Sequence, residues 1–158
     1  MAAPASKFHI MLVESMFYPE IAAEMAKGAM QELDKMGATY ERFEVPGCLE
    51  IPAAILYGIT MKQYHPARRR FDGYVALGCV IKGETHHFNI VAEESARGLQ
   101  NLATRYAIAV GNGIITAYTK EQALVRASAG GRNKGGSAAR ACLGMLNLKA
   151  RLGLYPRD

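Results

Sequence analysis

The chain contains no tryptophan and only three cysteines among its 158 residues. Because Cys48, Cys79 and Cys142 are odd in number, far apart and outside any C-x-x-C pair, they argue against a disulfide framework. We expect buried, reduced thiols. The sequence also lacks an apolar run of membrane-spanning length and an apolar N-terminal stretch of the secretory type. These absences favour a cytoplasmic protein without a membrane partner.

The positive charge is spread thinly along the chain. Lys and Arg number 19 against 14 Asp and Glu, which gives a net charge of +5. A nucleic-acid-binding protein would gather such charge into a patch. The only dense cluster is Arg68-Arg69-Arg70, which we interpret as a solvated loop between a helix and a strand. We therefore expect no nucleic-acid partner, and the scattered charge suits small anionic substrates.

Strand and helix patterns alternate along the whole sequence. The predicted strands cover residues 8–13, 39–45, 74–77 and 106–116. The predicted helices cover 19–36, 88–102, 119–127 and 138–152, and a further helix is expected to open near residue 49 and to fade into the basic loop at 68–70. A glycine-rich loop is expected at 130–136, and residues 1–7 are expected to form a disordered arm. Such a β-α succession predicts one α/β domain over residues 1–158. Its form would be a flavodoxin-like three-layer α/β/α sandwich, with a four-stranded parallel sheet and helices on both faces.

In a sheet of this kind, ligands bind beyond the carboxyl ends of the strands. The four loops at that edge are predicted at residues 14–17, 45–50, 78–87 and 111–113. Each of them is glycine-bearing or combines polar and aromatic residues. Sequence and topology therefore agree on where function should lie.

The third of these loops carries two chemical signals. Gly83 precedes Thr85 at the expected helix start, where free backbone N–H groups and the helix dipole attract anions. A threonine in this position can equally be a simple helix cap. His87, expected one turn into the helix, could take and return a proton. His86 should point about 100° away around the helix, and adjacent helical histidines cannot share one zinc ion.

Two further basic residues are open to a plainer interpretation. Arg126 lies late in a predicted helix, and Lys134 follows within G-G-R-N-K-G-G. This segment lacks the G-x-x-x-x-G-K-[ST] pattern of a phosphate-binding loop and does not follow a strand. Spacing alone favours a flexible surface loop with solvated charges.

Taken together, the loops resemble lumazine synthases, enzymes of riboflavin biosynthesis. V-P-G-C-L-E-I-P at residues 45–52 is similar to the family's V-P-G-x-x-E-I-P. G-C-V-I-K-G-E-T-H-H-F at 78–88 is similar to its G-x-V-I-[RK]-G-x-T-x-H-[FY]. Q-A-L-V-R-A at 122–127 followed by N-K-G-G at 133–136 resembles its last signature. The resemblance covers essentially the whole chain.

The resemblance implies a transferase reaction between two small substrates. In it, 5-amino-6-(D-ribitylamino)uracil condenses with 3,4-dihydroxy-2-butanone 4-phosphate to give 6,7-dimethyl-8-ribityllumazine. No metal or redox cofactor is implied. The family further implies a homo-pentamer with sites between subunits, stacked or built into a capsid in some assemblies, and it makes riboflavin synthase a candidate partner.

Residue roles also follow from the resemblance. The proton-transfer residue would be His87. Contacts to the ribitylaminouracil would come from Phe17, Cys48, Leu49, Glu50, Cys79, Val80, Ile81, Asn112 and Lys134. Contacts to the butanone phosphate would come from Gly83, Glu84, Thr85 and Arg126. Of these, Asn112 and Lys134 would serve a neighbouring subunit's site.

The chain departs from the family pattern at three places. Met16 stands where the family often has Arg, and Asn112 where it often has Phe. Thr116-Ala117-Tyr118-Thr119 replaces the usual T-x-E-N before the fourth helix, where Thr119 can still act as a cap. Two alternatives are a flavodoxin-like module that binds a flavin or phosphate without catalysis, and a shell-forming relative that has lost activity. Only the enzyme requires His87 and Arg126 together.

Overall fold

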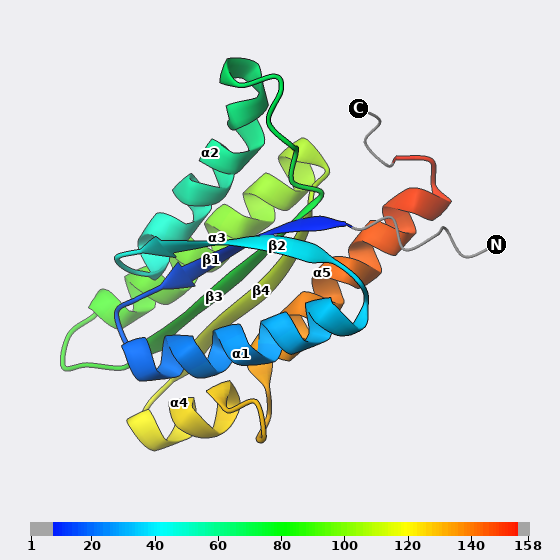
Figure 1. Cartoon of the computed structure of the whole chain (residues 1–158). Coiled ribbons are helices and arrows are strands. Elements are labelled where there is room, and N and C mark those ends of the chain that lie inside the picture. The colour runs from blue at the N-terminus through cyan, green and yellow to red at the C-terminus, as the bar shows by residue number, and fades with distance from the viewer. Residues whose placement is uncertain (1–7, 155–158) are drawn as a thin grey trace.

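A computed structural model describes residues 8–154, so the arm expected at residues 1–7 lies outside the described part of the chain. Helices and strands alternate around one sheet (Figure 1). The strands are β1 (His9–Ser15), β2 (Thr39–Val45), β3 (Gly73–Ile81) and β4 (Ala109–Ala117). The helices are α1 (Pro19–Lys35), the 3-10 turn η1 (Cys48–Glu50), α2 (Ile51–Tyr64), α3 (His87–Tyr106), α4 (Lys120–Ala127) and α5 (Lys134–Arg151).

The four strands form one parallel sheet in the order β2-β1-β3-β4. Helical crossovers join consecutive strands, as parallel pairing requires. The strand order reverses direction between β1 and β3, and such a switch point opens a crevice at the carboxyl ends of the strands. The prediction of a four-stranded parallel α/β fold is confirmed.

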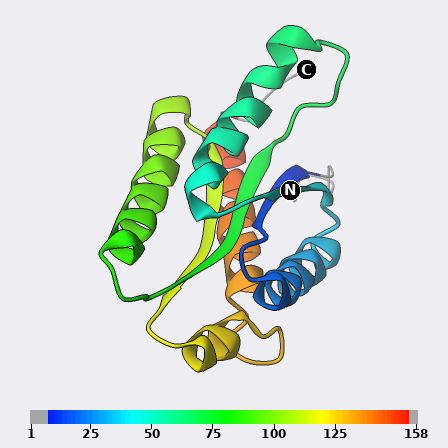
Figure 2. The same cartoon turned by 90° about the vertical axis from the view of Figure 1, so that its left-hand side faces the viewer.

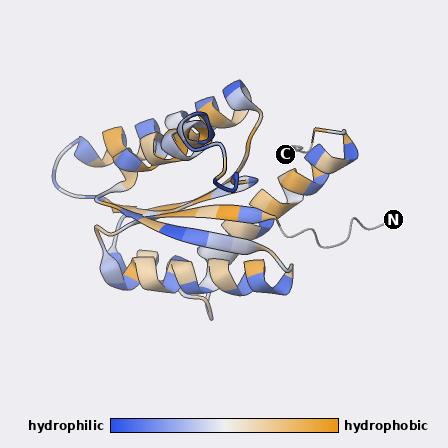
Figure 3. Cartoon of the chain, turned by 45° about the horizontal axis from the view of Figure 1, so that its top comes forward, coloured by the Kyte–Doolittle hydropathy of each residue, from blue (hydrophilic) through white to orange (hydrophobic). Residues whose placement is uncertain are grey.

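Helices cover both faces of the sheet (Figure 2). Alternate residues of β1 point to opposite faces, because a strand has a side-chain period of two. Ile10 and Leu12 belong to the core under α1, α4 and α5, whereas Met11 and Val13 belong to the core under α2 and α3. Figure 3 shows the resulting three layers, with the strands lying between two layers of helices. The three-layer sandwich is confirmed.

Local signals mark both ends of α1 and the start of α4 where the sequence predicted them. Pro19 opens α1, and Gly37 follows that helix with a φ of 69°, a left-handed conformation that favours glycine. The Thr119 hydroxyl accepts a hydrogen bond from the Gln122 amide at 3.1 Å, so the predicted cap of α4 is confirmed. These residues set where α1 ends before β2 and where α4 begins after β4.

Two predicted strand boundaries were wrong. β3 continues to Ile81, so the residues after Leu77 pair with β4 and do not begin a loop. The fourth strand begins at Ala109, because α3 continues to Tyr106 and ends at Ala107 in a left-handed conformation with φ 51°. Such caps are usually glycine. Because this cap is an alanine, the sequence contains no signal that the helix ends there.

The expected glycine-rich loop is also wrong in its second half. Asn133 caps α5 by accepting from the Gly136 amide at 3.1 Å, and Lys134 is the first residue of the helix. Gly135 is buried against the backbone of α1, where a Cβ would overlap the Met25 carbonyl. The glycines therefore bring two helices together and do not make the segment flexible.

Glu14 and Ser15, expected in the first functional loop, are buried in β1. The Glu14 carboxylate, 2% exposed, receives two hydrogen bonds of 2.8 Å from the half-exposed Arg42 side chain on β2. Glu14 shares the face of Ile10 and Leu12, away from α2 and α3. Its visible role is to hold β1 to the edge strand.

Replacing Arg42 with methionine is expected to lower the free energy of unfolding by about 2 kcal/mol, because it leaves the buried Glu14 carboxylate without its partner. The loss is smaller than for a fully buried ion pair, because Arg42 is half exposed and water can enter the space that its side chain leaves. Chemical denaturation measures this. The matched double variant, Glu14→Gln with Arg42→Met, should lose less than Arg42→Met alone. A double variant that is less stable than the single one would contradict this account.

Within residues 8–154, no helix is both long and apolar enough to cross a membrane. In the same range, no three His, Cys, Asp or Glu side chains gather closely enough to hold a metal ion.

Candidate active site

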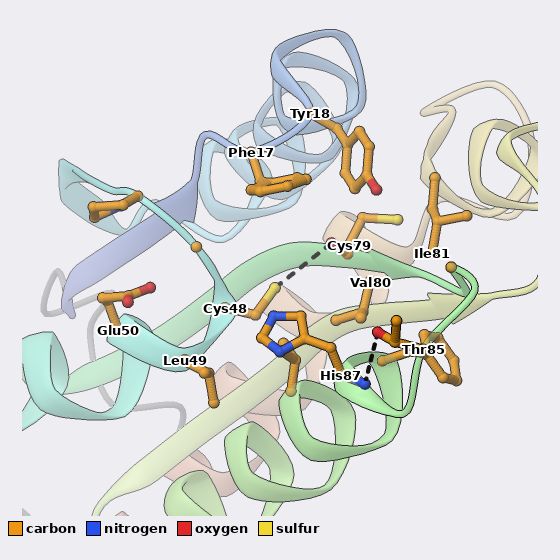
Figure 4. Close-up of a pocket in the computed structure, with 15 residues that line it drawn as sticks. Phe17, Tyr18, Cys48, Leu49, Glu50, Cys79, Val80, Ile81, Thr85 and His87 are labelled. Atoms are coloured by element: carbon orange, nitrogen blue, oxygen red, sulfur yellow. Dashed lines mark hydrogen bonds between the residues drawn. The ribbon is translucent and has the colours of Figure 1, made fainter.

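A cavity of about 410 Å³ lies at the carboxyl ends of β1, β2 and β3, beside the first turn of α3. This is the edge of the sheet at which the topology predicted function. Fifteen residues line it (Figure 4): Phe17, Tyr18, Pro46, Gly47, Cys48, Leu49, Glu50, Cys79, Val80, Ile81, Gly83, Thr85, His87, Phe88 and Val91. The structure thus brings together residues of the first three predicted loops.

The segment after β2 forms one wall of the cavity. Val45-Pro46-Gly47 turns the chain into η1, and Pro52 stands in the first turn of α2. Gly47 leaves room for the Glu50 carboxylate, because a Cβ at Gly47 would lie 3.1 Å from Glu50 Oε2. Glu50 is exposed, so its carboxylate is free to accept hydrogen bonds from a polar ligand.

Cys48 lines the cavity from η1, and Cys79 lines it from β3. The Cys48 thiol donates to the Cys79 carbonyl at 3.8 Å. Burial raises the pKa of the Cys48 thiol and raises that of Cys79 to about 12. Because the thiolate is the reactive form, these cysteines shape the cavity and do not act as nucleophiles at neutral pH. The expectation of buried, unpaired cysteines is confirmed.

His87 is the first residue of α3, so its expected place one turn into the helix was wrong. Its side chain is exposed and points into the cavity on the side of Cys48 and Leu49 (Figure 4). Its amide donates to the Thr85 hydroxyl at a long 3.4 Å. Thr85 therefore lies at the helix start, as predicted, where N–H groups suit an anion.

His86 lies outside the cavity lining, as its predicted direction required. Its ring is exposed and bonds to the Asn89 amide at 3.1 Å. Gly83 borders the cavity, and a Cβ there would meet no atom within 4 Å. Gly83 thus stands beside open space at the mouth of the cavity.

Phe17 and Tyr18 close the cavity from the side of β1. Phe17 is 68% exposed, and its ring meets Tyr18 edge to face with 4.9 Å between the centroids. A flat face of Phe17 is therefore open to a ligand. Sequence reasoning missed Tyr18, whose hydroxyl pKa is raised by burial. The signal available was an adjacent aromatic pair directly after a strand.

Four predicted site residues do not line this cavity: Glu84, Asn112, Arg126 and Lys134. Glu84 is exposed in the loop before α3. The Asn112 side chain accepts from the Ile114 amide at 3.0 Å, and Arg126 donates to the Gln122 carbonyl at 3.0 Å. The cavity lining contains no Lys or Arg. Within one chain, then, the predicted anion site has a helix start and no cationic side chain.

The cavity is formed largely by the segments that carry the sequence motifs. Comparison with known proteins identifies the family to which the chain belongs. The family model described as 6,7-dimethyl-8-ribityllumazine synthase matches residues 7–150. The chain belongs to this family. The 6,7-dimethyl-8-ribityllumazine synthase 1 of Rhizobium meliloti is 52% identical over 145 residues, which cover 92% of this chain and 94% of that protein. The 6,7-dimethyl-8-ribityllumazine synthase of Agrobacterium fabrum is 46% identical over 148 residues, covering 94% and 99% of the two chains.

Family membership confirms the resemblance read from the sequence. Two of the lumazine synthase motifs, at residues 45–52 and 78–88, contribute most of the cavity lining. The third, which ends in N-K-G-G, builds the start of α5 outside the cavity. In this member of the lumazine synthase family, two of the motifs therefore line the cavity of a single chain, and the third lies outside it.

Proposed function

We propose that the chain, acting as a single-domain transferase, catalyses the condensation of 5-amino-6-(D-ribitylamino)uracil with 3,4-dihydroxy-2-butanone 4-phosphate. The products are 6,7-dimethyl-8-ribityllumazine, inorganic phosphate and water. The observation that carries the proposal is that the two most specific motifs of the lumazine synthase family line one cavity at the switch point of the sheet. The cavity's size also suits a ligand of this kind.

The pyrimidine substrate lies between the Phe17 ring and the end of β3. Phe17 offers an open aromatic face, and Cys79, Val80 and Ile81 offer strand-end backbone groups to the uracil edge. Its ribityl chain extends along η1, where Cys48 and Leu49 contact it and the Glu50 carboxylate accepts from its hydroxyls.

The butanone phosphate lies at the start of α3. Gly83, Glu84 and Thr85 surround its phosphate, whose charge is favoured by the unpaired N–H groups of the first turn. Holding both substrates in one cavity makes their reaction effectively intramolecular. The amine attacks the ketone to form an imine with loss of water, phosphate leaves, and ring closure with dehydration completes the lumazine.

His87 moves protons in these steps. Its ring points into the cavity from the same turn that holds the phosphate, so it lies between the two substrates (Figure 4). A histidine can both accept and donate a proton near neutral pH. It can take the proton lost when the imine forms and return one to a leaving group.

The phosphate also needs cations, which the cavity lining of one chain does not supply. Arg126 and Lys134 stand at the end of α4 and the start of α5, and Asn112 stands on β4. We assign all three to the cavity of a neighbouring subunit in a homo-pentamer. For Arg126 this differs from the simple sequence expectation, in which it held the phosphate together with Glu84 and Thr85. Riboflavin synthase, which would consume the product, remains the candidate partner, and the cytoplasm the expected compartment.

The non-catalytic alternatives are not favoured. A module that only held a flavin or a phosphate would not need a histidine directed into the cavity beside the anion site. Relatives that align with 92% of the chain are named as 6,7-dimethyl-8-ribityllumazine synthases. A shell-forming relative without activity would have no reason to retain Glu50, Thr85 and His87 around one cavity.

Product formation tests the proposal. The purified protein, incubated with both substrates, should generate lumazine fluorescence and release one phosphate per lumazine formed. Omitting the protein or either substrate provides the controls. A folded, assembled protein that yields neither signal above the uncatalysed rate would overturn the proposed reaction.

A further inference from the structure

Tyr118 lies directly after β4, and its ring contacts residues at both ends of the segment that borders the cavity. The Lys82 ammonium nitrogen lies 5.5 Å from the centroid of the Tyr118 ring. The Phe88 ring lies 6.2 Å from the same ring, centroid to centroid. Because Lys82 precedes residues 83–87 and Phe88 follows them, a single ring joins the two ends of this segment.

The base of that ring is held firmly. The Tyr118 amide donates to the Gln122 side chain at 2.9 Å, and the Gln122 amide donates to the Thr119 hydroxyl at 3.1 Å. This reciprocal pair is a form of the capping box at the start of α4. The Lys82 amide donates to the Ala117 carbonyl at 2.9 Å, which extends the β3–β4 pairing by one residue.

The segment between these ends stands clear of the sheet. Residues 83–87 are all exposed, and a Cβ added at Gly83 would meet no atom within 4 Å. Its conformation therefore depends strongly on how its ends are held. A cation over an aromatic face and a pair of neighbouring rings are both attractive contacts, so removing the Tyr118 ring should loosen both ends of the segment.

We infer that Tyr118 is a positioning residue that holds the anion-binding segment 83–87 in its binding conformation. The inference rests on the proposed function, in which this segment binds the phosphate of one substrate. Ordering a segment in advance reduces the entropy that it loses on binding. The loss of the ring should therefore weaken binding of the phosphorylated substrate. It should slow the chemical step less, because His87 belongs to the first turn of α3, and it should leave unchanged the pyrimidine site between Phe17 and the end of β3.

The test compares Tyr118→Ala with Tyr118→Phe, which keeps the ring and removes only the hydroxyl. Tyr118→Ala should raise KM for the butanone phosphate about fivefold, equivalent to about 1 kcal/mol. Its kcat should fall by less than about threefold, and its KM for the pyrimidine should change by less than about twofold. Tyr118→Phe should behave as the wild type. Tyr64→Ala, which removes another exposed tyrosine at the far end of α2, is the matched control.

Amide hydrogen exchange provides a second readout that does not depend on turnover. In Tyr118→Ala, the amides of Asn89 and Ile90, which donate to the His86 carbonyl at 3.0 and 3.3 Å, should exchange faster than in the wild type, while those of β3 and α5 remain unchanged. An unchanged KM for the phosphorylated substrate, an equal rise in both KM values, or unchanged exchange at Asn89 and Ile90 would overturn the inference. If the wild type makes no product, the proposed reaction fails, and the exchange comparison alone decides the role of Tyr118.

Discussion

Replacing His87 with alanine is expected to lower kcat about a hundredfold, the lower range for losing a general acid or base. KM for either substrate should change by less than about threefold, because the phosphate and pyrimidine contacts proposed here come from other residues. The reason lies in the position of the ring, which enters the cavity beside Cys48 from the turn that carries Thr85. Steady-state rates of lumazine formation, with each substrate varied in turn, measure both quantities.

The neighbouring histidine supplies the matched control. His86 precedes His87 in the chain, but its ring bonds to Asn89 and does not line the cavity. His86→Ala should therefore keep kcat within about twofold of the wild type. If both variants lose the same activity, the loss comes from a disturbed start of α3. If His87→Ala retains wild-type turnover, His87 does not move the proton.

Gly135→Ala is expected to lower the free energy of unfolding by about 3 kcal/mol, at the upper end of ordinary overpacking. A Cβ at this position would overlap the Met25 carbonyl, and neither backbone can yield without separating α5 from α1. The midpoint of thermal unfolding should fall by about 10 °C for a chain of this length. Differential scanning calorimetry measures the shift.

Gly130→Ala is the control for this prediction. Gly130 lies in the same glycine-rich stretch, but a Cβ there would meet no atom within 4 Å. Its midpoint should stay within about 2 °C of the wild type. Equal, small shifts in both variants would show that residues 130–136 behave as the flexible loop that the sequence suggested.

The sequence predicted the parts of the fold that depend on local pattern. Alternation of strand and helix, the glycine after α1 and the Thr119 cap all rest on periodicity or on one residue's conformational preference. These signals sufficed to place the loops beyond β1, β2 and β3 at one edge. The predicted loops therefore gave the position of the cavity and contain most of the residues that line it.

The errors concern features that local pattern does not record. Ala107 ends α3 in a conformation usually taken by glycine, so the helix was cut short and β4 extended. Gly135 looked flexible because its close neighbour, Met25, is far away in the sequence. Glu14 read as a loop residue because nothing nearby indicates its partner Arg42 on the next strand. Each error depends on a contact or backbone conformation that only the folded chain reveals.

Residues at the site show the same division. Glu50, Thr85 and His87 line the cavity as predicted, because each belongs to a motif in which the chemistry of the side chain indicates its place. Tyr118 was noticed only as a departure from a pattern, since its contacts with Lys82 and Phe88 need the ends of three elements to converge. Arg126 was expected to hold the butanone phosphate with Glu84 and Thr85, and it does not line the cavity of its own chain.

The claim that an active site is shared between subunits is tested most directly by mixing two inactive variants. His87→Ala should inactivate the cavity of its own subunit, and Arg126→Ala should impair phosphate binding in the cavity of its neighbour. In mixed rings with one kind of heterologous contact, about a quarter of the interfaces would join an intact His87 to an intact Arg126. Dissociating and reassembling equal amounts of the two variants should then restore about a quarter of wild-type turnover. Mixed assemblies no more active than the separate variants would contradict a site shared in this way.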